Sequence, residues 1–379
     1  MKELVGEKLD QQKADRIKHE IEDALRPRHN VRRRTEKGSD RQFIVVVYEV
    51  EAVHWIPFID RPRDGIVYHS KQNFSLSPST DINIKKVNRV FFGGSNDQDL
   101  LIERFAGFNV GFENIKLGTD RLGVAVFYHR YHERWQPSTV AADRNAIYRN
   151  RSTVDPTLTF AFDPRFRLTA GVSLSQLQMQ YPVIHDNVAN AAVASLYFEN
   201  TWGKAGTDQH YLEAQYDFHA GNHELDSDFI YNRHFARAEY VYGHDKNQLI
   251  VIASAGTISG NAPLFEKFSL GNVETLRGWN KFDIAPAGGD RMINGTLQYR
   301  FGKPAGANIH IGDHRNSATD IHLGFHVFYD VGAVGNHGTP FSGKHSVGFG
   351  FGGKTFFMEL GFPIRSSDVA PIFMTGLRF

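Results

Sequence analysis

Residues 321–332 read IHLGFHVFYDVG, and this stretch decides the fold. The odd positions from Ile321 to Tyr329 hold Ile, Leu, Phe, Val and Tyr, whereas the even positions from His322 to Asp330 hold His, Gly, Phe and Asp. Successive side chains of a β-strand point to opposite faces of the sheet, so a period of two predicts a strand with one apolar and one polar face. The same alternation recurs at 165–175, 209–219 and 290–301, which predicts a mainly β protein.

Two architectures use such strands. In a soluble sandwich the apolar faces pack against each other, and strands average about five or six residues. In a transmembrane barrel the apolar face contacts lipid, the polar face lines the interior, and strands run about nine residues or more. Here the alternating stretches are long, and short turns at 163–164 and 221–222 alternate with long polar connections at 136–146 and 304–320. We therefore predict an antiparallel outer-membrane β-barrel over residues 106–379.

The composition excludes several functional classes. None of the 379 residues is Cys, which excludes a disulfide scaffold, a thiolate metal site and a cysteine nucleophile. Lys and Arg number 43 against 42 Asp and Glu, so the global charge favours no nucleic-acid partner. No apolar run reaches the roughly 18 residues of a conventional transmembrane helix. No signal-peptide pattern follows Met1, so we expect an exported form of this chain to be mature or truncated.

The 18 His are candidate catalytic and metal-binding groups. The closest pairs are His129 and His132, His219 and His223, and His322 and His326. On a strand, side chains four residues apart share a face but lie about 13 Å apart, too far to chelate one ion. The motifs HExxH, GxxxxGK[ST] and GxSxG are absent, and in GFGFGG at 348–353 glycine alternates with phenylalanine as in a barrel strand. We therefore predict no enzyme activity, no cofactor and no metal site.

The first 55 residues have a different pattern. Apolar residues at helical spacing predict an amphipathic helix over 7–26, and strands are predicted at 29–35 and 42–53. These elements predict a small α+β module over 1–55, and residues 56–105 are assigned to a linker and the first barrel strands. A basic cluster in the module comprises Arg26, Arg28, Arg32, Arg33 and Arg34. This cluster either faces solvent or contacts an anionic partner or lipid surface.

Residues 262–301 carry the most distinctive pattern, APLFEKFSLGNVETLRGWNKFDIAPAGGDRMINGTLQYRF. This segment resembles one in the BamA-like (outer-membrane protein 85, bacterial surface antigen) superfamily of assembly and translocation barrels. In that family a loop inside the barrel carries a (V/I/L)-R-G-(F/Y/W) tetrad, matched here by Leu276, Arg277, Gly278 and Trp279. The run before the tetrad matches at Pro263, Glu266, Phe268, Leu270 and Gly271. The G-G-[ND] motif after it matches at Gly288, Gly289 and Asp290, and the next strand's F-x-D-x-G motif matches at Phe328, Asp330 and Gly332.

The resemblance implies sixteen strands and an interior loop, residues 262–289, that Arg277 locks in place. Strand phase independently turns Asp330 and Gln298 toward the interior, because the odd positions face lipid. A desolvated arginine needs a charged partner, and the Asp330 carboxylate suits its planar guanidinium. Gln298 stands where the family has a second acid, and its amide accepts a hydrogen bond but pairs more weakly. Gly278 would allow a tight turn, and Trp279 would pack on interior side chains.

The same resemblance implies a function. Barrels of this family insert client β-barrel proteins into the bacterial outer membrane or translocate polypeptides across it. The expected partners are therefore outer-membrane lipid, client polypeptides and periplasmic accessory proteins that bind the N-terminal module. That module resembles the second half of a periplasmic POTRA domain, so we expect the chain to begin inside a longer parent. Two alternatives stay open: the membrane anchor of a larger protein such as a patatin-type lipase, and a passive diffusion porin.

Overall fold

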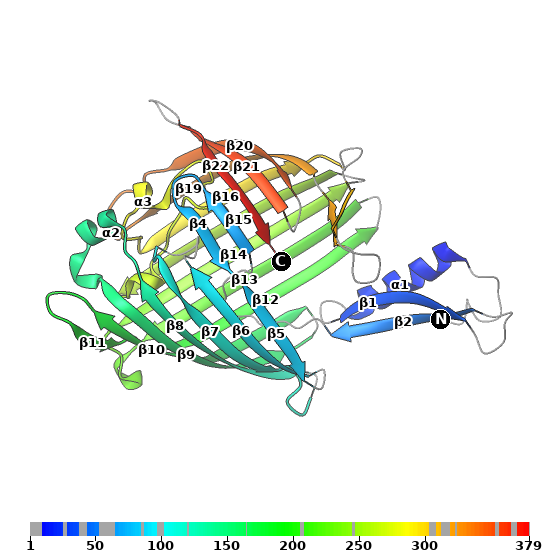
Figure 1. The fold of residues 1–379 in the computed structure, drawn as a ribbon, viewed down its shortest axis with the longest axis horizontal. Coiled ribbons are helices and arrows are strands. Elements are labelled where there is room, and N and C mark those ends of the chain that lie inside the picture. Colours follow the sequence, from blue (N-terminus) through cyan, green and yellow to red (C-terminus); the bar gives the residue numbers. More distant parts are fainter. Residues whose placement is uncertain are drawn as a thin grey trace.

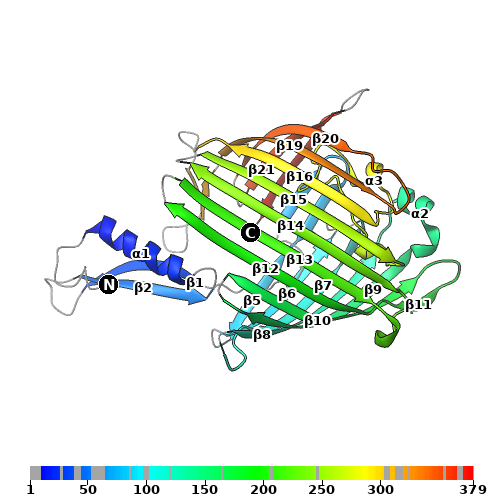
Figure 2. The same ribbon diagram turned by 180° about the vertical axis from the view of Figure 1, so that it is seen from behind.

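The computed structural model forms an N-terminal α+β unit and a closed β-barrel (Figures 1 and 2). The described residues are 10–25, 29–37, 44–52, 65–84, 87–96, 102–119, 121–163, 165–204, 208–244, 247–302, 308–311, 319–322, 324–352, 356–364 and 370–378.

The N-terminal unit consists of α1 (Gln11–Leu25) and an antiparallel pair, β1 (His29–Lys37) and β2 (Ile44–Ala52). Ala14 and Ile17 are buried on one face of the helix. The Tyr48 hydroxyl of β2 donates to the Ala14 carbonyl, and Arg33 of β1 pairs with Asp15 at 3.0 Å. The predicted helix and both predicted strands are therefore present. Arg26 and Arg28 of the basic cluster lie outside the described residues.

Sixteen antiparallel strands close the barrel. They are β3 (Gly65–His69), β4 (Asn73–Ser77) continued by β5 (Ser79–Ile84), β6 (Asn88–Asn96), β7 (Phe105–Asn114), β8 (Leu122–Glu133), β9 (Tyr148–Ala161), β10 (Phe166–Met179), β12 (Ala191–Lys204), β13 (Asp208–Gly221), β14 (Tyr231–His244), β15 (Asn247–Gly260), β16 (Arg291–Arg300), β19 (Gly324–Gly335), β20 (Lys344–Gly352), β21 (Phe356–Pro363) and β22 (Ile372–Arg378). The short β11 (His185–Val188) pairs with the end of β10. The barrel thus begins at Gly65, within the stretch that the sequence assigned to a linker and first strands.

The two faces of the wall follow the predicted alternation. On β19, Val327 and Tyr329 are exposed on the outside, whereas His326, Phe328 and Asp330 are buried inside. The alternating stretch at 321–332 is, however, divided between two sheets. Residues 319–322 form β18, which pairs with β17 (Asn308–Ile311) in a separate hairpin, and β19 begins only at position 324. The alternation therefore predicted the faces correctly but placed the start of this strand too early.

The two ends of the barrel differ in their connections. The connection at 162–165 joins β9 and β10 at one end, and β17 and β18 lie in the connection at that same end. Residues 222–230 join β13 and β14 at the opposite end and contain η3 (His223–Leu225). The prediction of a short turn at 221–222 was therefore wrong, because the Asn222 side chain begins a 3-10 turn by accepting a bond from Leu225 N–H. The end that holds the 162–165 connection is called the turn end, and the opposite end, with the 222–230 connection, is called the loop end. Figure 1 shows α1, β1 and β2 beside the turn end, whereas α2 (Pro137–Ala142) and α3 (Lys281–Ile284) lie at the loop end.

The connection 261–290, between β15 and β16, folds into the loop end of the barrel. It contains η4 (Leu264–Glu266) and α3, and its apolar residues pack against inward-facing side chains of the wall such as Tyr148, Leu177 and Tyr231. This cluster is the largest apolar core of the described chain. Among the described helices, none is long and apolar enough to span a membrane.

Candidate functional site

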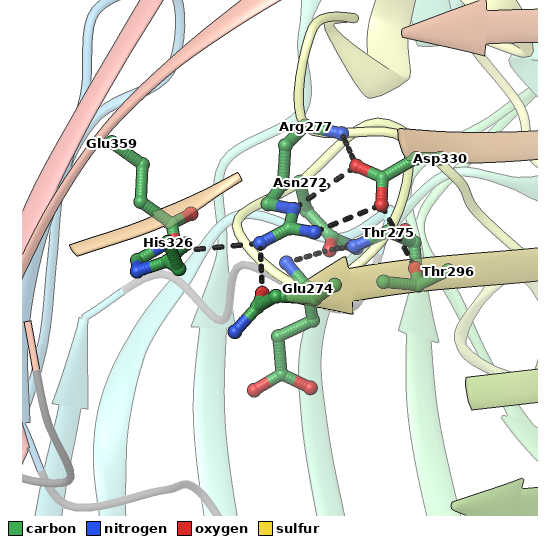
Figure 3. Close-up of polar contacts among 9 residues, drawn as sticks. Asn272, Glu274, Thr275, Arg277, Thr296, His326, Asp330 and Glu359 are labelled. Carbon is green, nitrogen blue, oxygen red and sulfur yellow. Dashed lines mark hydrogen bonds and ion pairs between the residues drawn. The ribbon is translucent and has the colours of Figure 1, made fainter. Parts of the chain in front are cut away.

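The tetrad arginine lies inside the barrel against Asp330 of β19 (Figure 3). Arg277 Nε and Nη2 donate to the two Asp330 carboxylate oxygens at 3.0 and 2.9 Å, which is a two-pronged ion pair. The Arg277 backbone N–H and the Thr296 hydroxyl also donate to this carboxylate, at 3.0 and 2.9 Å. Asp330 is completely buried, and these four bonds offset the cost of burying its charge.

The third guanidinium nitrogen joins two further strands to the site. Arg277 Nη1 donates to Gln298 Oε1 of β16 at 2.9 Å and to Glu359 Oε1 of β21 at 3.3 Å. His326 Nε2 of β19 lies 2.9 Å from the same Glu359 oxygen. Arg277 is therefore surrounded by an acid and an amide, as the sequence predicted, and by a second acid that the sequence did not reveal.

An aromatic ring completes the surroundings of the guanidinium. Arg277 Cζ lies 3.4 Å from the centroid of the Phe328 ring, at the distance of a cation–π contact. A side chain at Gly348 would put its Cβ 2.2 Å from Phe328 Cζ, so the glycine leaves space for this ring. Phe328, matched only as part of a motif, therefore contacts the arginine directly.

Glycines bring the loop backbone close to the wall. A Cβ at Gly278 would lie 2.7 Å from Ser346 Cβ and 2.8 Å from the Phe362 carbonyl carbon. A Cβ at Gly361 of β21 would lie 2.6 Å from the Arg277 carbonyl oxygen. Leu276, fully buried, adopts φ 45°, a left-handed conformation that turns the chain just before the arginine. The Arg277 backbone thus fits a space that any larger residue at these glycines would fill.

The remaining motif residues fix the two sides of the loop. Trp279 is buried and donates its indole N–H to the His345 carbonyl of β20 at 2.8 Å. Gly289 and Phe268 exchange backbone hydrogen bonds across the base of the loop, and Gly288 at φ 69° precedes that bridge. A Cβ at Gly332 would lie 3.0 Å from Leu270 Cδ1, so this glycine leaves space for the loop.

A second polar contact holds the loop to the opposite wall. Glu266 accepts hydrogen bonds from the Tyr231 hydroxyl at 3.0 Å and lies 2.9 Å from His219 Nδ1, while Arg233 Nε donates to its backbone carbonyl at 3.0 Å. Burial alone would raise the pKa of the Glu266 carboxyl, but His219 and Arg233 outweigh it and hold that pKa below its usual range. The loop is therefore attached to β13 and β14 as well as to β16, β19 and β21.

The pairing that closes the barrel, between β22 and β3, is called the seam here. Among the described residues it has five register pairs, from Met374 with His69 to Arg378 with Gly65, whereas β13 and β14 share fourteen. The loop residue Val273 belongs to one buried apolar cluster with Phe357, Ile372 and Met374 on the inner side of the seam, and the partly buried Val67 of β3 packs against this cluster. The seam and the β3–β4 pairing, which also has five register pairs, are the two shortest pairings of the wall among the described residues.

The structure places every residue of the predicted lock, Arg277, Gly278, Trp279, Asp330 and Gln298, in one contiguous region. Sequence reasoning missed Glu359, His326 and Thr296, and it missed Glu266 as a buried anchor. The only signal for Glu359 is its polar position in an alternating strand, which does not say what lies opposite it. Within the described residues, no group of three or more His, Cys, Asp or Glu is placed to hold a metal ion.

Comparisons with known proteins agree with this geometry. The Omp85 superfamily domain matches residues 106–358. The fold is similar to BamA from Haemophilus ducreyi lacking POTRA domains 1-3, with a TM-score of 0.59, 14% identity, and coverage of 99% of this chain and 80% of that one. It is also similar to CdiB from Escherichia coli, with a TM-score of 0.55, 13% identity, and coverage of 99% of this chain and 72% of that one. CdiB from Acinetobacter baumannii gives a TM-score of 0.54 at 11% identity, covering 96% of this chain and 68% of that one. No curated protein matches the sequence.

Proposed function

The chain belongs to the Omp85 superfamily, and on this premise we propose that it inserts client β-strands into the bacterial outer membrane through its seam. In this proposal the barrel acts without making or breaking covalent bonds. The family places it among barrels of the bacterial outer membrane that insert or translocate polypeptides. The insertion of barrel proteins is the finer statement that the proposal adds.

The short seam is the observation that carries the proposal. Unpaired backbone groups are costly in lipid, so the cost of opening a barrel rises with the number of paired residues along the broken edge. Five register pairs at the seam make it a cheaper place to open than the fourteen-pair contact of β13 with β14. The β3–β4 pairing also has five, but residues 70–72 join those two strands directly, whereas β22 and β3 are the last and first strands of the barrel. An open seam presents two strand edges, on which a client strand can form by β-augmentation.

The interior loop argues against the porin alternative. Its apolar core and its two polar anchors lie inside the barrel against the wall, where a diffusion pore would need a water-filled path. We propose that the contacts of Arg277 with Asp330 and Gln298 act as the lock that keeps this loop docked. The anchor alternative, a barrel that only holds a larger protein in the membrane, would need no opening seam.

For the N-terminal unit we propose a periplasmic role in client capture, as a POTRA-like module. In the described part of the chain β2 pairs only with β1, so its other edge is available for an extended client segment. The high charge of α1 disfavours burial in lipid. Attachment beside the turn end of the barrel would put this module in the periplasm.

The test is to close the seam reversibly. Ile66 and Leu377 are register partners and both exposed on the outer face, so the double variant Ile66→Cys/Leu377→Cys can form a disulfide across the seam. The chain has no other cysteine, which makes the cross-link specific. The matched control is Val251→Cys/Leu297→Cys, an equally exposed register pair between β15 and β16.

Both variants would be reconstituted in liposomes and supplied with an unfolded outer-membrane barrel protein. We expect the oxidised seam variant to lose client insertion and to recover it on reduction, while the oxidised control keeps its activity. Equal insertion by the oxidised and reduced seam variants would refute the proposal. If the native protein does not accelerate client folding, the result would favour the anchor alternative.

A further inference from the structure

The second acid of the lock stands on a different strand from the one the family pattern implies. Gln298 of β16 occupies the expected position, and the carboxylate that contacts Arg277 comes instead from Glu359 of β21. We propose that Glu359 is a positioning residue that replaces the missing acid, and that its place on β21 couples docking of the interior loop to closure of the seam. This inference rests on the proposed function of the seam.

A glycine on the intervening strand makes the relocation possible. In the register of β19, β20 and β21, Gly350 lies between His326 and Glu359. A Cβ at Gly350 would lie 2.9 Å from His326 Nε2 and 2.7 Å from Glu359 Cγ. The two side chains therefore meet across β20 only because position 350 has none. The glycine-rich run at 348–353 thus accommodates the contacts of the loop, first at Phe328 and then at Glu359.

The position of Glu359 ties the arginine to the seam. Glu359 is the register partner of Met374 on β22, and Met374 is the register partner of His69 on β3. These three side chains are all buried on the inner face, in one row that crosses the seam. Asp330 and Gln298, in contrast, lie on β19 and β16, whose pairings in the described part of the chain are with β15, β20 and each other. Among the three side chains that accept hydrogen bonds from the Arg277 guanidinium, only Glu359 lies on the strand next to β22.

Apolar and polar contacts of the loop tip act in the same direction. Val273 shares a buried apolar cluster with Ile372 and Met374 of β22, and Val67 of β3 packs against that cluster, so the docked loop contributes to an apolar cluster that spans the seam. Gln72, in the turn between β3 and β4, donates to the Gly271 carbonyl at 2.8 Å. A loop pulled toward β21 by Glu359 therefore holds these contacts in place. Release of the Glu359 contact should loosen the loop and the seam together.

The test transfers the second acid from position 359 to position 298 and measures loop docking and seam closure with separate reporters. Ser346 is completely buried beneath Gly278, so the rate at which a soluble maleimide labels Ser346→Cys reports loop undocking. Nitroxide labels on Ile66→Cys and Leu377→Cys report the seam, because their dipolar broadening is lost when the strands separate. Each reporter would be placed in the native chain, in Glu359→Gln and in Gln298→Glu/Glu359→Gln. Glu239→Gln, another inward glutamate, paired with Arg237 on β14, is the control.

We expect Glu359→Gln to raise Ser346→Cys labelling about tenfold and to reduce the dipolar broadening, since it removes one charged acceptor. The double variant should restore slow labelling, because Arg277 regains a second acid, but should leave the seam loosened, because that acid is no longer on β21. Glu239→Gln should change neither reading.

Restoration of both readings by the double variant would overturn the claim that the coupling depends on the place of the acid on β21. Unchanged labelling in Glu359→Gln would overturn the role of Glu359. A Glu359→Gln barrel that fails to fold, seen by its migration on unheated gels, is replaced by Glu359→Asp, which keeps the charge and shortens the reach. It should show the same two changes at smaller size, and no change in either would also overturn the proposal. No client is used, so these outcomes are independent of the seam cross-linking test of function.

Discussion

Replacement of Arg277 by alanine should release the interior loop without unfolding the barrel. The side chain donates two hydrogen bonds to Asp330, one to Gln298 and one to Glu359, and its guanidinium covers the Phe328 ring. All these partners belong to wall strands, and the backbone pairing of those strands does not depend on the arginine. The loop should therefore undock while the wall stays closed.

The magnitude follows from what Asp330 retains. Loss of one partner of a buried ion pair costs about 3–5 kcal/mol when the other charge is left uncompensated. While the loop of Arg277→Ala is docked, the Asp330 carboxylate keeps the backbone N–H of residue 277 and the Thr296 hydroxyl as donors, so the loss of docking free energy should be near the lower limit. A change of about 3 kcal/mol corresponds to a roughly 100-fold larger undocked fraction. Arg277→Lys keeps the charge but lacks the planar fork, and should give roughly a tenfold increase.

The assay is the labelling rate of Ser346→Cys, since Ser346 lies under the docked Gly278 and the chain has no other thiol. Ser138→Cys, exposed on α2, should label at one constant rate in every variant and so controls for the reagent. The difference in gel migration between heated and unheated samples should be the same for all variants, which would confirm that the barrel is folded in each. A labelling rate for Arg277→Ala within twofold of the native rate would refute the reasoning, because the loop would then be held by its other contacts alone.

Three further predictions use the same chain. Gly278→Ala should raise Ser346→Cys labelling by at least tenfold, because its Cβ would overlap the wall at 2.7 Å, whereas Gly295→Ala, whose Cβ would meet its nearest atom at 3.4 Å, should leave the rate unchanged. Because the pKa of Glu266 is lowered when the loop is docked, its stabilising contribution is complete above pH 4.5 and is lost as the pH falls toward about 2. The thiolate fraction of every cysteine falls over this range, so the rate is taken relative to that of the exposed Ser138→Cys at the same pH; this ratio should rise as the pH falls, and less steeply in Glu266→Gln. Protease added to intact cells should leave the N-terminal unit uncut and should cut it once the outer membrane is permeabilised; cleavage in intact cells would contradict the proposed orientation.

Much of the fold was predictable because barrel strands carry their two environments in the sequence. The alternation predicted a β-barrel with the faces of β19 correctly assigned, and the match of the Omp85 domain confirms the family that the loop motif indicated. The errors fall where the alternation carries no information. Residues 319–322 alternate like the strand that follows them but pair with β17, and the choice between a short turn and a loop at 221–222 depends on the Asn222 side chain.

The candidate site was predictable only as far as sequence neighbours and strand phase reach. Phase puts Asp330, Gln298 and Glu359 on the inner face alike, so it cannot say which of them a loop arginine touches. That depends on the register of β19, β20 and β21 and on the absence of a side chain at Gly350. The missing acid at Gln298 made the lock look weaker in the sequence than it is in the structure, where Arg277 still has two carboxylates. Because those carboxylates belong to β19 and to β21, the strand beside the seam, moving the second acid changes which part of the wall the loop holds. The glutamine at position 298 looks in a sequence comparison like the loss of a charge. In the folded barrel, the second carboxylate bonded to Arg277 instead comes from another strand, β21.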